Sequence, residues 1–485
     1  MKAIFPVLDE SRQRPYYLQL YDHIKGAILS GNISEGEKLP SLRNLSKSTG
    51  LSLTTVENAY NQLLVEGYIH SRASSGYYAD RVHMTGSPAA GTPYTDIGMP
   101  GFDDASGGSA SGTAADERMR GGPAAEERMR GDPAADLPAM KYDPDCFDFN
   151  KWKKCMNRVL NENSPTLFFE GSPQGEAALR WEISSYLYRS RGVSCHPDQI
   201  FIGAGTQQIT SLLANILKDL KIENVVLETP GYAPVRNTFR DRGFEIIHVG
   251  VDANGLLLES LPSGKPAAAY VSPSNNSLSG SIMPIGRRYE MLRWAMKNDS
   301  YIIEDDYDSE LRYFGRPIPP IKSIAEDERV IYLGSFSSTL FAAVKISYMV
   351  LPTKIAEDFS SKLSGYSQTC SKLEQLTLAK FMETGMYQTH IRKLRKLYSQ
   401  KLSLVTDILK KDASDLVEIR NNASGIGLLL KIKGRNIPLK KILKDARSLG
   451  IPAVSSDGLV LLSYNQIPLG EIPEVIDRLL ARWRN

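Results

Sequence analysis

The segment QIFIGAGTQQITSLLANIL, from Gln199 to Leu217, decides the fold of most of this chain. It begins with a short β-prone apolar run, turns at two glycines, and continues with apolar residues at helical spacing. An apolar strand that leads directly into a helix is the repeating unit of a doubly wound α/β sheet. Gly205, Thr206 and Gln207 lie at the turn, where their backbone amides are expected to form a phosphate site at the start of the helix.

Four later segments repeat this pattern: NVVLETP, AAAYVSP, YIIEDDY and RVIYLGSF. Each is a short apolar run that ends in glycine, proline or carboxylates, and helix-length segments separate most of them. This order predicts a mostly parallel sheet whose strands bring functional groups to one edge. From about residue 402, GIGLLLKIKG and GLVLLSY alternate with helical segments, which predicts a smaller α+β subdomain at about 402–485.

A different pattern occupies residues 12–80. The segment YYLQLYDHIKGAILSG has apolar residues at helical spacing and ends in glycine, which predicts a first helix. Ser41 is then expected to cap a short helix, Gly50 to form a turn, and Ser52 or Thr54 to open a second helix. Two short helices joined by a glycine turn form a helix-turn-helix. The segment YIHSRASSGYYAD that follows predicts a two-stranded wing.

In a helix-turn-helix, the start of the second helix contacts base edges in the major groove. A basic residue at the start of the preceding helix is placed to bind phosphate, and the wing to contact the backbone or the minor groove. The same pattern would also describe a small helical bundle that does not bind DNA. The candidate DNA contacts are Arg43, Ser52, Thr54, Thr55, Asn58, Arg72, Ser75 and Gly76.

The bulk composition narrows the class of protein. The 485 residues include 58 basic and 55 acidic side chains, and the net charge of +3 is too small to indicate nucleic-acid binding by itself. We find no run of roughly 18 apolar residues and no signal-peptide pattern, so a cytoplasmic protein that does not enter the membrane is expected. The four cysteines lack paired spacing, which favours reduced thiols over disulfides or a metal site.

Residues 81–140 differ from the rest of the chain. They are rich in Gly, Ala, Ser, Pro and charge, and contain the near-repeat DERMRGGPAA and EERMRGDPAA. Each copy has one methionine as its only sizeable apolar side chain, so the segment cannot offset the entropy cost of ordering. We therefore predict a flexible linker between residues 12–80 and residues 141–485.

The predicted strand ends carry side chains that suit pyridoxal phosphate. The segment IIEDDYDSE places Asp305 and Tyr307 two residues apart, ETPGY supplies the ring of Tyr232, and GSFSS supplies the hydroxyls of Ser335 and Ser337. A carboxylate keeps the cofactor's pyridine nitrogen protonated, and an aromatic ring can stack on the pyridine. Together with the phosphate site at the glycine turn, these groups predict a cofactor pocket.

The N-terminal pattern resembles a known family. The segment YLQLYDHIKGAILSGNISEGEKLPSLRNLSKSTGLSLTTVENAYNQLLVEGYIHSRASSG is similar to the GntR-type winged helix along its whole length, including GEKLPSLR and TVENAYNQLLVEGY. The resemblance implies that residues 12–80 bind double-stranded DNA. Leu53 and Glu57 stand where the family carries basic residues. The affinity for DNA should therefore depend more on the symmetric pairing of two subunits and on the wing.

The remainder resembles class I aminotransferases of fold type I, and specifically the aminotransferase-like half of MocR-type regulators. The segments DQIFIGAGTQQITSLLANIL, YVSPSNNSLSG, IIEDDYDSELRYFGRPIPPIKSI and VIYLGSFSSTLF occur in the order of that family. The resemblance implies that the chain is multidomain: a winged helix, a linker, and an α/β aminotransferase-like domain. It implies a homodimer as well. The implied cofactor residues are Gly205, Thr206, Gln207, Tyr232, Asn275, Asp305, Tyr307, Ser335, Ser337 and Lys345.

Several positions depart from the enzymes of that family. The motif S-K-T-L-F reads S-S-T-L-F, so Ser338 stands where the Schiff-base lysine is expected. A hydroxyl cannot form an imine, and transamination also needs the lysine to move a proton. Glu170 replaces a tyrosine, Leu461 the carboxylate-binding arginine, and Lys345 the phosphate-binding arginine. The family's H-Q-F-P-T-G reads N-N-S-L-S-G.

These departures predict a transcriptional regulator with a pseudo-aminotransferase domain that serves dimerisation and possible effector sensing. No residue is assigned a catalytic role. An alternative is that the same regulator holds pyridoxal phosphate, or its aldimine with an amino acid, without a covalent bond to the chain. A third alternative is an active aminotransferase joined to a DNA-binding domain.

Overall fold

A computed structural model of the protein describes residues 16–72, 76–80, 143–276, 278–313, 318–325, 328–421, 426–433, 438–456 and 458–484. Ser75 and the predicted linker at 81–140 lie outside the described residues. The limits proposed for the linker and the domains therefore stay predictions. Within the described ranges, no helix is both long enough and apolar enough to cross a membrane.

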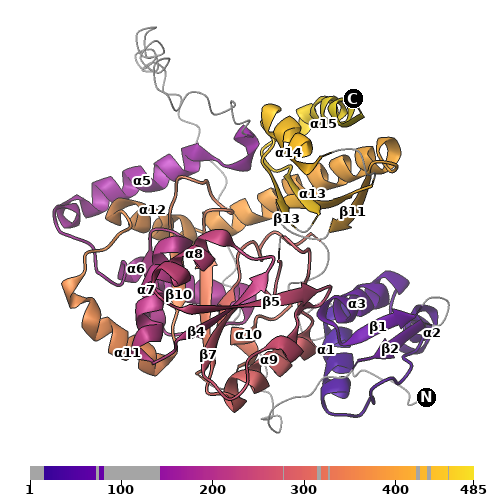
Figure 1. The fold of residues 1–485 in the computed structure, drawn as a ribbon, viewed down its shortest axis with the longest axis horizontal. Helices are drawn as coiled ribbons and strands as arrows, with labels where there is room; N and C mark the ends of the chain where they lie inside the picture. Colours follow the sequence, from indigo (N-terminus) through magenta and orange to yellow (C-terminus); the bar gives the residue numbers. More distant parts are fainter. Residues whose placement is uncertain are drawn as a thin grey trace, which may run out of the picture. The chain divides into compact units, whose positions relative to one another are not determined.

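The N-terminal part forms the predicted winged helix-turn-helix (Figure 1). Ser41 caps α2 by accepting a hydrogen bond from the amide of Asn44, and Ser52 caps α3 by accepting one from the amide of Thr55. Gly50 takes φ +71° in the turn between these helices, a conformation that glycine adopts without strain. The elements are α1 (Tyr16–Leu29), α2 (Leu42–Thr49), α3 (Leu53–Glu66), β1 (Ile69–Arg72) and β2 (Gly76–Ala79), with β1 and β2 antiparallel.

The winged helix has its own apolar core. Ile24 of α1 and Val56, Tyr60 and Leu63 of α3 are fully buried, as the helical spacing of the sequence predicts. The Tyr60 hydroxyl donates to the carbonyl of Pro40 at 2.8 Å, which ties α3 to the start of α2. Full burial of such side chains contributes roughly 1.5–3 kcal/mol each.

The large domain is built on an eight-stranded sheet in the order β3-β10-β9-β8-β7-β4-β5-β6. The pairs among β5, β4, β7, β8 and β9 are parallel, while β10 is antiparallel to both β3 and β9. The mostly parallel sheet of the prediction is confirmed. The strands are β3 (Ile200–Gly203), β4 (Asn224–Thr229), β5 (Glu245–Asp252), β6 (Gly255–Leu256), β7 (Ala267–Val271), β8 (Tyr301–Asp305), β9 (Val330–Ser335) and β10 (Ser347–Val350).

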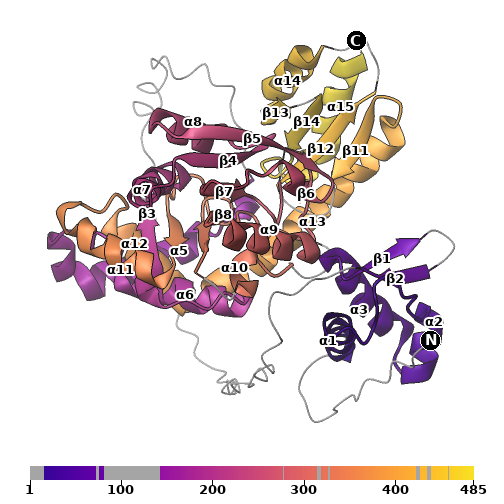
Figure 2. The ribbon, with the colours of Figure 1, turned by 60° about the horizontal axis from the view of Figure 1, so that its bottom comes forward.

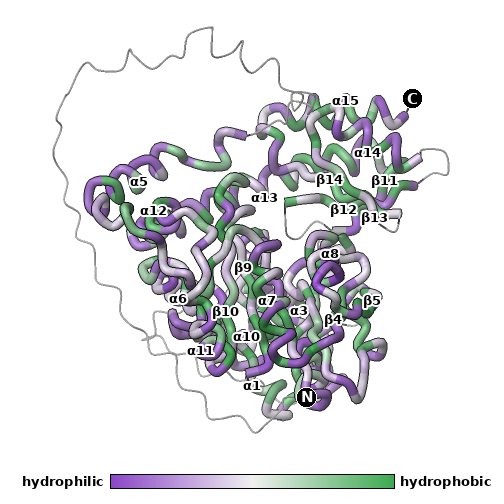
Figure 3. The backbone as a smooth tube through the Cα atoms, turned by 60° about the vertical axis from the view of Figure 1, so that its left-hand side comes forward, coloured by the Kyte–Doolittle hydropathy of each residue, from purple (hydrophilic) through white to green (hydrophobic). Residues whose placement is uncertain are grey.

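Both faces of this sheet are buried under helices (Figure 2). Val225 and Leu227 of β4 belong to the core on one face, with α7 and α8, while Val226 lies between them on the other face, with α9. A strand buried on both faces reads as a continuous apolar run, as in AAAYV of β7, and Figure 3 shows hydrophobic segments around the labels β9 and β10. The helices are α5 (Phe149–Asn163), α6 (Ala177–Arg191), α7 (Thr206–Asp219), α8 (Ala233–Asp241), α9 (Ile285–Lys297), α10 (Ile321–Ile324), α11 (Thr353–Lys362) and α12 (Lys372–Glu383).

The long helix α13 (Met386–Asp412) leads into a smaller α+β part. Its four-stranded antiparallel sheet has the order β11-β12-β14-β13 and packs with α13, α14 and α15 around Leu428, Leu462, Ile476 and Leu479. The elements are β11 (Val417–Asn421), β12 (Gly427–Ile432), α14 (Leu439–Ser448), β13 (Ala453–Ser456), β14 (Leu459–Ser463) and α15 (Ile472–Arg484).

Candidate cofactor pocket and DNA-binding face

A cavity of about 770 Å³ lies at the carboxyl ends of β4, β7, β8 and β9. Parallel strands deliver their last residues to one edge of the sheet, and this edge is where open α/β folds bind ligands. Gly427, Val454 and Leu461, from the four-stranded sheet, line the opposite side. The volume falls within the range of small-molecule and cofactor sites.

The cavity brings together most of the predicted cofactor residues. Its lining includes Thr206, Tyr232, Asn275, Asp305, Tyr307, Ser335 and Ser337. Gly205, Gln207 and Lys345 do not line it. A Cβ atom added to Gly205 would lie 3.9 Å from Cδ of Lys345. The Lys345 side chain therefore lies close to the start of α7.

The start of α7 keeps the properties of a phosphate site. Gly205 occupies the N-cap position with φ +84°, and no side chain caps the helix there. The first amides of the helix therefore have no side-chain acceptor and can point to an anion, which the helix dipole also favours. The hydroxyl of Ser337 donates to the carbonyl of Val344 at 3.1 Å, so its oxygen still has lone pairs to accept a hydrogen bond.

Asp305 is the last residue of β8 and Asp306 follows it, and the two carboxylates have different roles because adjacent residues of an extended segment point to opposite faces. Asp305 lines the cavity, and its Oδ2 accepts a hydrogen bond from the Tyr270 hydroxyl at 2.6 Å. Burial raises the pKa of Asp305 to about 7. A cationic group of a ligand would lower that pKa again, so this carboxyl is suited to hold a protonated ring nitrogen.

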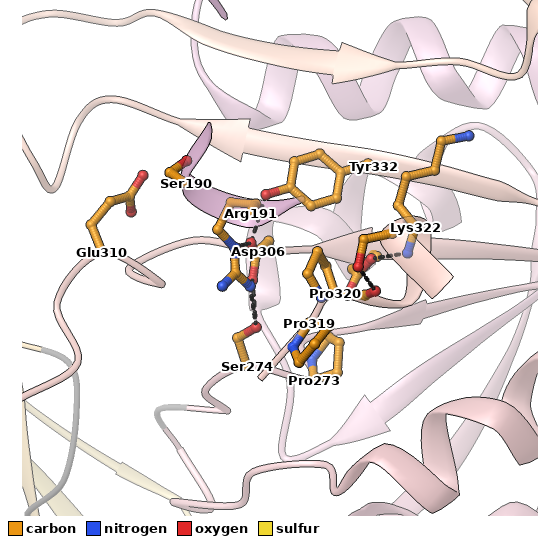
Figure 4. A network of polar contacts seen from close by, with 12 residues as sticks. Ser190, Arg191, Pro273, Ser274, Asp306, Glu310, Pro319, Pro320, Lys322 and Tyr332 are labelled. Atoms are coloured by element: carbon orange, nitrogen blue, oxygen red, sulfur yellow. Dashed lines mark hydrogen bonds and ion pairs between the residues drawn. The ribbon is translucent and has the colours of Figure 1, made fainter. Parts of the chain in front are cut away.

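Asp306 is held on the other side by a buried network (Figure 4). Both Asp306 oxygens accept from the guanidinium of Arg191, at 2.6 and 2.9 Å, and Tyr332 donates to Oδ2 at 2.6 Å. The hydroxyl of Ser274 completes the network, as a donor to Asp306 and an acceptor from Arg191. Because Asp306 is fixed in this way, the adjacent Asp305 is positioned at the cavity.

Three features of the pocket escape the sequence prediction. Glu228 is buried in the lining, accepts from the amide of Ser272 at 3.1 Å and from Asn276 Nδ2 at 2.9 Å, and burial raises its pKa to about 7. Asp308 is also a buried lining residue. Both carboxylates follow or end apolar runs that the sequence analysis did recognise, so their position at strand ends is the signal that could have found them. The third is Arg191, which lies far from Asp306 in the sequence.

The winged helix exposes most of the predicted DNA contacts. Arg43 of α2 and Thr54 and Asn58 of α3 are exposed to solvent. Ser52 and Thr55 are instead engaged with each other, since Ser52 Oγ accepts from the Thr55 amide at 3.1 Å and lies 2.8 Å from the Thr55 hydroxyl. These contacts between Ser52 and Thr55 therefore stabilise the start of α3 in the absence of DNA.

On the wing, Arg72 donates to the ring of His70 at 3.2 Å, and its guanidinium lies 4.5 Å from the ring centre of Tyr78. This stacking holds the side chain along the surface of the hairpin. Gly76 opens β2 with φ +110°. Leu53, the first residue of α3, is 45% exposed.

Comparison with known families agrees with both halves of this description. Residues 16–78 match the family of bacterial regulatory proteins called the gntR family, and residues 139–442 match aminotransferase class I and II. The structure is similar to the multiple substrate aminotransferase of Thermococcus profundus, with a TM-score of 0.61 and 23% identity over 76% of this chain and 96% of that one. The fold and the site together define a DNA-binding regulator joined to an aminotransferase-like domain.

Relatives that span the whole architecture are regulators by their descriptions. The protein named "Uncharacterized HTH-type transcriptional regulator YdeL" of Bacillus subtilis is 34% identical over 99% of both chains. The "Probable rhizopine catabolism regulatory protein MocR" of Rhizobium meliloti is 31% identical over 88% of this chain and 83% of that protein. The chain belongs to the MocR-type transcriptional regulators.

Enzymes with this fold use pyridoxal phosphate, and the pocket fits that group in part. Asp305 would hold the ring nitrogen, Tyr232, which lines the same cavity, would stack on the ring, and the uncapped start of α7 with Ser337 would take the phosphate. When bound, the cofactor would supply an electron sink. The lining does not fit covalent attachment, because its residue at the expected position is Ser338.

Proposed function

We propose that this transcriptional regulator uses its aminotransferase-like domain to bind a small molecule reversibly and does not catalyse transamination. The residues that line the cavity give this proposal its main support. Ser338 lies in it beside Ser337, and the lining contains no lysine among the residues that the structure describes. Without a lysine, the covalent attachment of the cofactor has no group to perform it, and the amine that moves the proton in an aminotransferase is missing.

The groups kept in the pocket support a ligand. Asp305, Glu228 and Asn276 are buried, and the first two are ionisable carboxyl groups, which are costly to bury in an apolar core. A domain that served only as a scaffold would gain stability from apolar side chains at these positions. Retention of polar groups around a cavity of about 770 Å³ therefore supports a pocket that still binds a molecule, with non-covalent pyridoxal phosphate as one candidate.

We further propose that the domain forms a homodimer. Phe168 is 89% exposed and Phe169 72%, directly before Glu170 in the chain, and Trp181, eleven residues after it in α6, is 62% exposed. Large exposed apolar side chains commonly mark a protein interface. In the fold type I resemblance, Glu170 corresponds to a residue that reaches the neighbouring subunit, so this surface supports a dimer with two winged helices.

The DNA-binding half of the proposal predicts sequence-specific binding. From a pool of randomised duplexes, the purified full-length chain should enrich a defined site, as measured by sequencing of bound DNA. Replacement of Arg43 by alanine should weaken binding to that site at every sequence tested. It should also reduce the slope of log affinity against log salt by about 1, because one phosphate contact is lost.

Arg158→Ala is a matched control, because it removes one exposed arginine from helix α5 of the large domain. Its affinity and salt slope should equal those of the unmodified chain. Equal affinity of the Arg43→Ala variant would show that Arg43 does not contact phosphate. Failure to enrich any sequence would contradict the regulator assignment itself.

A further inference from the structure

Asp308 is a buried carboxylate that the pocket leaves unsatisfied. It lines the cavity, its residue is 4% exposed, and its Oδ1 atom has no hydrogen-bond partner among the described residues. Its backbone has φ +57°, which places a non-glycine residue in the left-handed region. A buried acceptor without a partner is costly, and in a native fold it calls for an explanation such as a functional role or a bound water, ion or ligand.

Among the residues that the structure describes, no cation neutralises this carboxylate. Burial raises the pKa of Asp308 to about 6, and a hydrogen bond from Ser338 is the one interaction that lowers it. The titratable groups that act on it electrostatically are Asp305 from the same segment and the phenols of Tyr313, Tyr398 and Tyr464. Within the described ranges, acids and neutral phenols surround Asp308, which points to a ligand as the source of a positive charge.

The position of Ser338 indicates where a positive charge would lie in this pocket. In the family resemblance, this position carries the lysine whose amine meets the reactive carbon of the cofactor. A lysine here would place its ammonium group near Asp308, but the serine hydroxyl is neutral. The pocket has therefore lost the amine and kept the carboxylate.

We propose that the pocket binds a ligand bearing a protonated primary amine, which Asp308 and Ser338 hold, and that it takes pyridoxamine phosphate in preference to pyridoxal phosphate. This proposal rests on the proposed function, since it names the ligand of the same pocket. With the ring on Asp305 and the phosphate at the start of α7, the aminomethyl group lies at the carbon that the missing lysine would have approached. Aliphatic amines are protonated at neutral pH, whereas the aldehyde of pyridoxal phosphate offers Asp308 no donor.

Titration calorimetry on the full-length chain tests this preference. Pyridoxamine phosphate should bind at least tenfold more tightly than pyridoxal phosphate, because a charge-assisted hydrogen bond to a buried carboxylate corresponds to roughly 10- to 100-fold in affinity. Asp308→Asn should remove this preference. Asp299→Asn, the same chemical change at an exposed aspartate paired with Arg329, should preserve it.

A second measurement on the unmodified chain does not depend on the folding of any variant. At pH 6 about half of the Asp308 carboxyls carry a proton, which the ammonium would expel. Titrations in buffers of different ionisation enthalpy should show roughly half a proton more released with pyridoxamine phosphate than with pyridoxal phosphate, and little difference at pH 8.

Equal or tighter binding of pyridoxal phosphate would overturn the proposal, as would binding of neither compound or an Asp308→Asn chain that keeps the preference. These outcomes leave the regulator assignment intact, because enrichment of a DNA site is measured separately.

Discussion

Replacement of Arg191 by leucine is expected to lower the free energy of unfolding of the large domain by about 3–5 kcal/mol, because it leaves Asp306 buried without its partner. The side chains of Arg191 and Asp306 are 3% and 0% exposed. The leucine cannot replace the two hydrogen bonds to the carboxylate, and only Tyr332 and Ser274 remain to solvate it. The loss should also disturb the pocket, since Asp306 adjoins Asp305.

Urea unfolding followed by tryptophan fluorescence measures this effect. All four tryptophans, Trp152, Trp181, Trp294 and Trp483, lie outside the winged helix, so the signal reports the large domain. Arg158→Leu is the matched control, because Arg158 pairs with Glu162 at 2.7 Å on the exposed surface of α5 and should leave the midpoint unchanged. Equal midpoints for the two variants would show that the buried pair does not hold the domain together.

The ligand-free large domain is expected to lose at least about 2 kcal/mol of stability between pH 5 and pH 8. Burial raises the pKa values of Glu228, Glu304 and Asp305 to about 7, and that of Asp308 to about 6. An acid with a raised pKa in the folded state binds its proton more tightly there than in the unfolded chain. Its contribution to stability is therefore complete below about pH 4 and is lost as the pH rises through 6 to 7.

Few positive charges lie near these carboxyl groups among the described residues. Arg288 lies 3.8 Å from Glu304. Arg191 is paired with Asp306, the residue next to Asp305. Urea unfolding at pH 5, 6, 7 and 8 gives the profile, and Glu228→Gln should flatten it by removing one titrating group. Glu223→Gln, at an exposed position, should reproduce the original profile. Stability that rises from pH 6 to pH 8 would contradict the account.

The strands and caps of this fold were predictable because their signals are local. Ser41 and Ser52 cap the helices at which the sequence placed them, and the apolar runs at 224–230, 267–273 and 301–307 contain strands β4, β7 and β8. Strand β10 was not predicted. It comes a few residues after β9 and returns antiparallel between β9 and β3, so its pairing depends on the sheet as a whole.

The pocket was predictable only where a strand end carried a recognisable side chain. Asp305 ends β8 and Tyr307 lies two residues later, whereas Arg191 ends helix α6, where a basic residue usually indicates a solvent-exposed helix terminus. Its pairing with Asp306 spans 115 residues and depends on how α6 packs against the sheet. The missing partner of Asp308 is likewise a property of the assembled cavity and has no local pattern.

The most direct measurement of the central claim is mass spectrometry of the full-length chain after incubation with pyridoxal phosphate and reduction with borohydride. Borohydride converts an imine between the cofactor and a lysine into a stable amine bond. Because Ser338 occupies the attachment position, the account predicts a chain without a stoichiometric pyridoxyl group, and no oxo acid formed from added amino acids. One pyridoxyl group per chain on a single lysine, together with transamination, would contradict it.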